Sequence, residues 1–267
     1  MYWSETIQRV HVCAATTIKR LTKWYHDVNA AYDAENYFGF CASLRGLVES
    51  CADSFYTIGK ITDPLCENFA PIEQALNGRA KTVLLSAEIE DELIHYVFAR
   101  KRTASERAVT PESHEAKQVR DYLSSIGKQS IVDLYFELCQ VSHASALSLV
   151  PFLLATEEHG PVLHEEHIDK ELNDNILNRH KGTILGASNL AALPAMCLLL
   201  LIDEFDAPIT EALKTPHTAL EAAVHTSLWK DMETKIRASR KASGPVRAGP
   251  SSLGFAISRR DPKGSDK

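Results

Sequence analysis

The chain has 267 residues, of which 45% are hydrophobic and 24% are charged, and its formal net charge is -6 at pH 7. This composition is ordinary for a soluble globular protein, and the length is sufficient to bury a sizeable core. From Arg240 onward there are seven lysines and arginines against two aspartates, which leaves residues 1–239 at about -11. An acidic body disfavours nucleic acid as the main partner, although a local patch could still bind it.

The six cysteines form neither a CxxC pair nor a zinc-finger spacing, and most lie within apolar helical patterns. The first residues, MYWSETIQRVHV, lack a basic stretch followed by an apolar run, so we expect no secretory signal. The sequence therefore predicts a reduced, cytoplasmic protein.

The first predicted helix starts near Ser4 and ends near residues 30–33. The second covers residues 35–60, and its apolar residues fill one wide arc of the helical wheel. Arg45 lies beside that arc, with Glu49 one turn further on. A guanidinium in an apolar face needs partners, because a desolvated charge is costly. Either Glu49 and a neighbouring helix neutralise it, or it faces a polar pocket.

The next segments are shorter and more polar. Pro64 and Pro71 bracket a short irregular or helical piece, and a helical pattern over 72–101 is broken around Asn77 and Gly78. Residues 103–112 look like a polar loop. A modest helix follows and is stopped by Gly127.

A strongly apolar helix is predicted from Ser130, where Ser130 to Asp133 resembles a capping box, to Thr156 with a kink at Pro151. His143 lies among apolar positions on its wheel, so we expect it to be buried. It is either a core histidine bonded to a backbone or side-chain group, or a member of a polar pocket with Arg45 and Glu49.

Pro161 suits the first turn of the next helix, which is expected to end near residues 181–182. Residues 184–202 contain no charge and approach the length that spans a bilayer. Ser188, Asn189 and Pro194 interrupt this run, so we expect a buried core helix and no membrane partner. A last amphipathic helix covers residues 208–240.

The predicted fold is therefore all-α, with no convincing strand: a multi-helix bundle over residues 1–241, in which a sub-boundary could fall near 157–161. Residues 242–267 are rich in Gly, Pro, Ser and basic residues, which predicts a disordered tail. This tail either only solubilises the protein or is a weak, salt-sensitive anchor for nucleic acid or anionic surfaces.

Two histidine–carboxylate patterns have spacings that occur in metal sites. Glu92 and His95 have the Glu-x-x-His spacing of di-iron bundles, but the sequence has no second copy and the wheel turns His95 away from the apolar face. His164, His167 and Glu171 could hold zinc if another ligand arrived. In both places we expect a solvated helix face, and we expect no metal and no other cofactor.

Three stretches resemble a group of bacterial all-helical proteins of unknown function: Arg45 to Glu49, Glu92 to Lys101, and Leu138 to His143. In that group an Arg-x-x-x-Glu helix precedes a Leu-Cys/Ser-x-x-x-His helix. The resemblance covers about residues 35–155 and implies a shared site of Arg45, Glu49 and His143. It implies no particular substrate.

Arg20 and His26 have an Arg-x5-His spacing that resembles the HEPN superfamily, helical bundles whose members include RNases. That resemblance implies that both residues contact phosphate and assist cleavage. The polar residue that follows the arginine in the family is Leu21 here. Residues six apart on a continuous helix also face away from each other, so the motif requires a helix end nearby.

Two functions follow as hypotheses. The first is a binding or regulatory protein, for example a stress or phage-defence component, that uses its helical surfaces to bind a protein partner or a second copy of itself. The alternative is a metal-independent RNase-like or other hydrolytic enzyme, with Arg45 as the phosphate or oxyanion contact and His143 as the general base.

Overall fold

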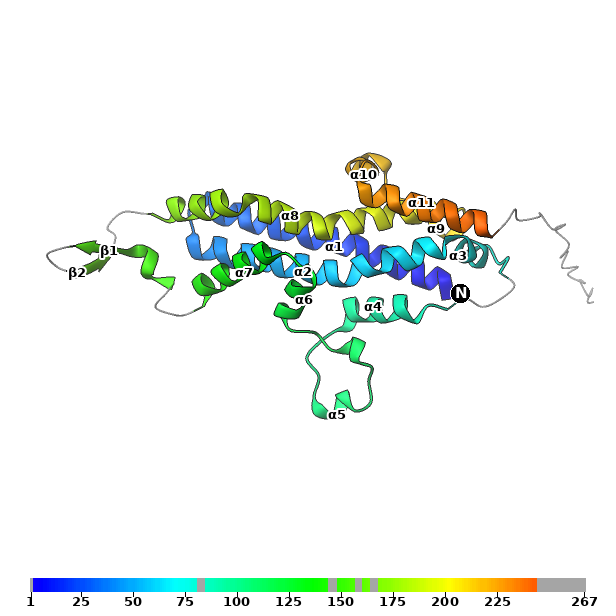
Figure 1. The fold of residues 1–267 in the computed structure, drawn as a ribbon, viewed down its shortest axis with the longest axis horizontal. Helices are drawn as coiled ribbons and strands as arrows, with labels where there is room; N and C mark the ends of the chain where they lie inside the picture. The colour runs from blue at the N-terminus through cyan, green and yellow to red at the C-terminus, as the bar shows by residue number, and fades with distance from the viewer. Residues whose placement is uncertain (1, 81–84, 144–147, 157–159, 164–167, 244–267) are drawn as a thin grey trace, which may run out of the picture.

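The computed structural model describes residues 2–80, 85–143, 148–156, 160–163 and 168–243. These residues form a helical bundle, so the predicted all-α class is confirmed. Three long helices are its frame: α1 (Tyr2–Asp33), α2 (Tyr37–Glu67) and α8 (Asp169–Asp203). Figure 1 shows α1 running one way along the long axis of the molecule, with α2 and α8 running the other way.

Shorter elements surround this frame. α4, α6 and α7 pack against α2, and α11 packs against α2, α3 and α8. The bounds of the shorter helices and helical turns are α3 (Phe69–Leu76), α4 (Ala87–Phe98), α5 (Ala104–Arg107), η1 (Glu112–His114), α6 (Val119–Ser125), α7 (Gln129–Ser142), η3 (Val150–Phe152), α9 (Pro208–Glu211), α10 (His217–Val224) and α11 (Ser227–Ala242).

α2 begins where the Asn36 side chain accepts the backbone N–H of Gly39, and its apolar arc is buried as predicted. The predicted end at residue 60 was wrong, because the helix passes through Pro64. Leu65 and Cys66 continue the buried stripe beyond that proline, so tertiary packing compensates for the backbone hydrogen bond that proline cannot make.

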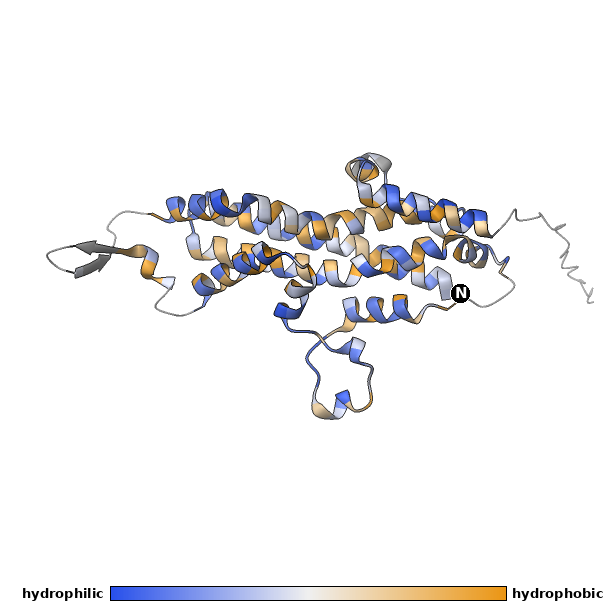
Figure 2. Cartoon of the chain, viewed as in Figure 1, coloured by the Kyte–Doolittle hydropathy of each residue, from blue (hydrophilic) through white to orange (hydrophobic). Residues whose placement is uncertain are grey.

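The core consists of two clusters along the long axis. One joins the first half of α1, the second halves of α2 and α8, and the helices α3, α4, α10 and α11. The other joins the second half of α1, the first halves of α2 and α8, and the helices α6 and α7. In Figure 2 apolar and polar residues alternate around each long helix, as expected for helices that bury one side.

α8 is a single helix of 35 residues, so the predicted break near residues 181–182 was wrong. Among the described helices it is long and apolar enough to cross a membrane by length and composition, and 61% of its most apolar window is buried inside the protein. A core helix meets the same criterion, and residues 184–202 pack here between α1 and α2.

The predicted helix that reaches Thr156 was also wrong. α7 ends at Ser142, and a small antiparallel hairpin follows η3: β1 (Leu153–Thr156) pairs with β2 (Gly160–Leu163). Pro161 therefore lies in a strand. Gly160 has a φ of +71°, a backbone conformation that favours glycine and a chain reversal.

The start of α7 and the course of the last predicted helix also differ from the prediction. The N-cap of α7 is Lys128, so Ser130 lies inside the helix and caps nothing. The last amphipathic pattern is divided into α9, α10 and α11, and the Thr226 side chain starts α11 by accepting the backbone N–H of Trp229. α11 ends at Ala242, and the predicted disordered tail lies, from residue 244 on, outside the described residues.

Candidate functional site

Arg45 and Glu49 lie together at the contact between α2 and α7. Arg45 Nε donates to Glu49 Oε1 at 2.9 Å, and the Tyr135 hydroxyl donates to the same oxygen at 3.0 Å. The Arg45 guanidinium also lies over the Tyr135 ring, 5.8 Å from its centroid. Glu49 and a residue of the neighbouring helix thus supply the partners that the sequence required for Arg45.

The protonation states of this cluster favour a structural role. Partial burial acts to lower the pKa of Arg45, but the hydrogen bond and charge of Glu49 raise it overall. Burial raises the pKa of the Tyr135 hydroxyl, and its contacts with Cys139 and Glu49 raise it further. A proton-transfer catalyst needs a pKa close to the working pH, and neither shift moves a group in that direction.

His143 does not lie on a buried helix face, and the prediction of its burial was wrong. It is the C-cap of α7, with extended backbone, and its side chain is exposed. Arg45, Glu49 and His143 are all described, and no hydrogen bond or ion pair joins the His143 imidazole to the other two. The wheel failed because the helix ends one residue earlier; residues 144–147, which follow, lie outside the described part.

Arg20 and His26 also lie apart. α1 is continuous from Tyr2 to Asp33, so the helix end that the Arg-x5-His motif requires is missing at this position. Arg20 Nη2 donates to Asp53 Oδ2 and to Ser54 Oγ, both at 2.7 Å, on α2. His26 is exposed on another side of the helix.

His95 is the residue for which sequence reasoning failed most clearly, because it is 5% exposed rather than solvated. Its ring contacts the Ser113 carbonyl through Nδ1 at 2.8 Å and the Tyr122 hydroxyl through Nε2 at 2.9 Å. The Tyr122 oxygen in turn accepts the backbone N–H of Lys117 at 3.1 Å. A carbonyl can only accept, so Nδ1 carries a proton and donates a hydrogen bond to Ser113.

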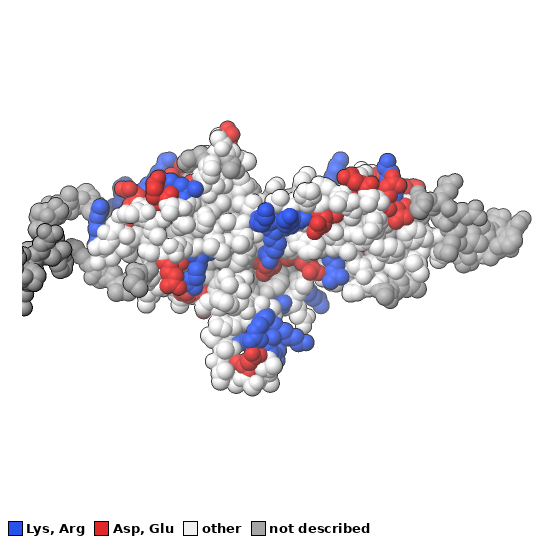
Figure 3. Space-filling view, turned by 180° about the vertical axis from the view of Figure 1, so that it is seen from behind, with Lys and Arg blue, Asp and Glu red and all other residues white. Residues whose placement is uncertain are grey.

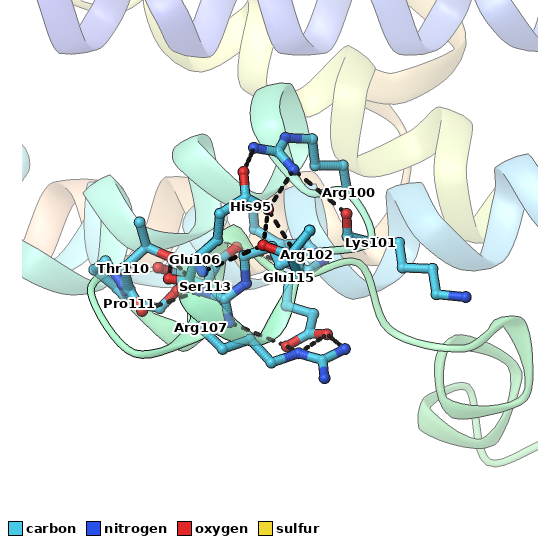
Figure 4. Close-up of polar contacts among 11 residues, drawn as sticks. His95, Arg100, Lys101, Arg102, Glu106, Arg107, Thr110, Pro111, Ser113 and Glu115 are labelled. Carbon is cyan, nitrogen blue, oxygen red and sulfur yellow. Dashed lines mark hydrogen bonds and ion pairs between the residues drawn. The ribbon is translucent and has the colours of Figure 1, made fainter.

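The segment that covers His95 is an excursion of residues 99–118, which leaves the bundle after α4 and returns at α6 (Figure 1). Its centre is Arg102, which is 7% exposed. Arg102 Nη1 donates to the carbonyls of Thr110 and Pro111 at 2.9 and 2.7 Å, and Nη2 donates to Glu115 at 3.1 Å (Figure 4). The periodicity of α4 could not predict that His95 is buried, because a helical wheel does not include a segment that folds over the helix from elsewhere in the chain.

Ion pairs between surface side chains connect parts of the excursion to one another. Arg100 pairs with Glu106, and Arg107 pairs with Glu115, both at 2.6 Å. Figure 3, the view from behind, shows basic side chains gathered on this projecting part of the molecule, with acidic ones among them. Because the three arginines of residues 99–118 are paired with Glu106 and Glu115, the excursion is a polar cover for His95.

Between this cover and the bundle lies a polar cleft of about 280 Å³. Each residue of its wall carries a carboxylate or another hydrogen-bonding group: Tyr56, Asp91, Glu92, His95, Glu112, Ser113 and Lys117. The hydrogen bond between Lys117 and Tyr56 is the largest cause that raises the pKa of Lys117.

A second cavity, of about 450 Å³, lies between α2 and α8 and is mainly apolar. It lies where the two core clusters meet: Phe55 and Leu190 pack against one cluster and Leu228 against the other. Pro194 of α8 also lines it and has no N–H to donate to the Leu190 carbonyl. The full lining is Phe55, Tyr56, Gly59, Lys60, Thr62, Ser125, Asn189, Leu190, Leu193, Pro194 and Leu228.

Tyr56 and Lys60 form the boundary of the two cavities. Tyr56 lines both of them. Lys60 lines the apolar cavity, and its Nζ lies 3.5 Å from the centroid of the Tyr56 ring and 2.9 Å from Glu92 Oε1 in the polar cleft. An apolar cavity with a few polar groups at its edge is the usual form of a small-molecule site, so this is the candidate site.

The Glu92 and His95 pattern does not form a metal cluster. Glu92 is paired with Lys60, and both ring nitrogens of His95 are engaged. Within the described ranges, no group of three His, Cys, Asp or Glu side chains could hold a metal ion, and His164 and His167 lie outside those ranges.

No protein family, curated protein or solved structure matches the chain.

Proposed function

We propose that this protein is a binding protein rather than an enzyme, and that the apolar cavity between α2 and α8 is its ligand site. The observation that carries the proposal is the cavity itself, which has a volume of about 450 Å³ and a mainly apolar wall. Small-molecule sites typically have volumes of about 300–1,000 Å³, with a few polar groups that orient the ligand. A regulatory component, for example of a stress response or of phage defence, would use such a site to sense a small molecule.

The enzyme hypothesis has less support. It requires Arg45, Glu49 and His143 to converge, whereas Arg45 and Glu49 bind each other and Tyr135, and His143 lies on the exposed end of α7. A charged pair that is already satisfied offers little to a developing charge on a substrate. We therefore place the function at the cavity and not at this cluster.

The test is a titration of the purified full chain with a neutral, apolar fluorescent dye such as Nile red. A Cβ at Gly59 would meet only Phe55 Cδ2, at 3.9 Å, so a larger side chain can enter the cavity without moving the backbone. Leucine is also a better helix former than glycine by about 0.8 kcal/mol. Gly59→Leu should therefore remain folded and bind the dye at least about tenfold more weakly than the wild type.

Gly182→Leu is the matched control. Gly182 lies in α8, it does not line the cavity, and no atom lies within 4 Å of the Cβ that would be added there. This variant gains the same helix propensity and should bind the dye like the wild type. Equal dye binding by all three proteins, or no binding by any of them, would overturn the proposal.

A further inference from the structure

The charges around the cavity indicate what kind of molecule it accepts. We infer that the ligand is a small monocarboxylate with an apolar body, which rests on the proposed function of the cavity as a binding site. The carboxylate lies at Lys60, and the apolar body lies against Leu190, Leu193 and Pro194.

The first argument is the sign of the charge. Among the described residues that line the cavity, Lys60 is the one charged residue, and none is an aspartate or glutamate. An apolar, uncharged ligand would leave the Lys60 N–H groups that do not bind Glu92 without a partner in the ligand. A carboxylate satisfies that edge, because charge-assisted hydrogen bonds are the stronger ones.

The second argument is the supply of donors. An ammonium group has three N–H donors, and Glu92 Oε1 is the hydrogen-bond acceptor of Lys60 among the described residues. Asn189 also lines the cavity, is exposed, and its amide makes no hydrogen bond with another described residue. Lys60 and Asn189 therefore supply hydrogen-bond donors from two helices that line the same cavity.

The third argument concerns orientation. The adjoining polar cleft contains the carboxylates of Asp91, Glu92 and Glu112. Like charges repel, so these three carboxylates disfavour an anionic group inside that cleft. An amine, by contrast, would compete with Lys60 for Glu92 and would place a second positive charge beside it.

The experiment compares three ligands with the same chain and different end groups: decanoate, decanol and decylamine. Each is titrated at pH 7 by calorimetry or by displacement of the neutral dye from the full chain. We expect decanoate to bind best and decylamine worst. The preference for decanoate over decanol should be about fivefold, the upper end for an ion pair that is open to water.

Two substitutions assign this preference to Lys60. Lys60→Gln should remove it, weakening decanoate about fivefold and leaving decanol unchanged. Glu92→Gln removes the carboxylate that competes for Lys60 and should strengthen decanoate binding. Lys23→Gln is the control for net charge: Lys23 is exposed on α1 and does not line the cavity, so its loss should change neither affinity.

The outcomes separate this inference from the proposed function. If decanol and decanoate bind equally and Gly59→Leu abolishes both, the cavity is a binding site and the inference of a carboxylate is wrong. The same conclusion follows if Lys60→Gln leaves the preference unchanged. If no ligand and no dye binds, the proposed function is wrong, and the inference of a carboxylate ligand is wrong with it.

Discussion

At the scale of single residues, the burial and the partners of each charged or titratable side chain depend on the element that faces it. Arg102 is buried because carbonyl groups of its own excursion surround it, whereas Arg45 stays 29% exposed beside Glu49. His95 is buried and His143 is exposed, the reverse of what their helical wheels indicate. The identity of the residue does not decide its role; its tertiary partners do.

A double-mutant cycle tests whether Arg45 and His143 share a site. An ion pair that is partly open to water is worth about 0.2–1 kcal/mol, so Arg45→Leu should cost no more than about 1 kcal/mol of unfolding free energy. His143→Ala should be nearly neutral. Because no hydrogen bond joins the two side chains, the double variant should equal the sum of the single ones within about 0.5 kcal/mol in urea unfolding.

Arg45→Leu combined with Glu49→Gln is the positive control, since Nε and Oε1 are 2.9 Å apart and these two effects should couple. A coupling above about 1 kcal/mol between Arg45 and His143 would contradict the geometry. It would also restore the enzyme hypothesis.

Glu106 gives a pH prediction. The hydrogen bond from Arg100, followed by those from Thr103, lowers the pKa of Glu106 from 4.5 to about 2. In the folded chain this carboxylate therefore stays charged at a pH where it would be protonated in the unfolded chain. Its contribution to stability is complete above about pH 4.5 and is lost as the pH falls from 4.5 towards 2.

The measurement is an NMR titration of the Glu106 carboxyl carbon. In the wild type it should titrate close to 2, and Arg100→Gln should move the titration upward. Lys101→Gln removes a neighbouring charge that makes no ion pair with Glu106 and should leave the titration unchanged. A wild-type titration near 4.5 would show that the Arg100 contact does not form in solution.

At the scale of elements, one contact between α1 and α2 depends on a glycine. A Cβ at Gly46 would lie 2.5 Å from Cη2 of Trp24, on α1. The absence of a side chain at this position lets the indole ring pack directly on the α2 backbone. At Gly59, in the same helix, a Cβ would meet only Phe55 Cδ2, at an ordinary contact distance of 3.9 Å.

This difference predicts opposite signs for the same substitution. Gly46→Ala should lower the free energy of unfolding, because overpacking costs about 1–3 kcal/mol and exceeds the gain in helix propensity of about 1 kcal/mol. Gly59→Ala should raise the free energy by up to about 1 kcal/mol. Urea unfolding of both variants measures the difference. A similar gain in unfolding free energy in both would show that the Trp24 ring moves aside without a loss of stability.

At the scale of the whole molecule, three long helices carry two core clusters, and the candidate site lies at their junction. α2 and α8 contribute to both clusters, which places Phe55 and Leu190 beside Leu228 of α11. Sequence segments on both sides of residues 157–161 share each cluster. The excursion of residues 99–118 adds a polar cover next to this junction.

The sequence alone determined the fold class and the buried faces of the long helices. The apolar arc of α2 is periodic and the run of residues 184–202 is apolar throughout, and burying such surfaces is the main driving force for packing. It also determined that Arg45 needs a partner such as Glu49, because four residues on a helix bring two side chains together.

Only the tertiary structure decided the helix ends, the burial of His95 and the cavity. Pro64 did not end α2 and the residues around 181–182 did not end α8, because packing against neighbouring helices outweighs a lost hydrogen bond or a weak local propensity. His95 is covered by a segment whose own sequence pattern is that of a loop. A cavity is a gap between elements that lie far apart in the chain, so no local pattern records it.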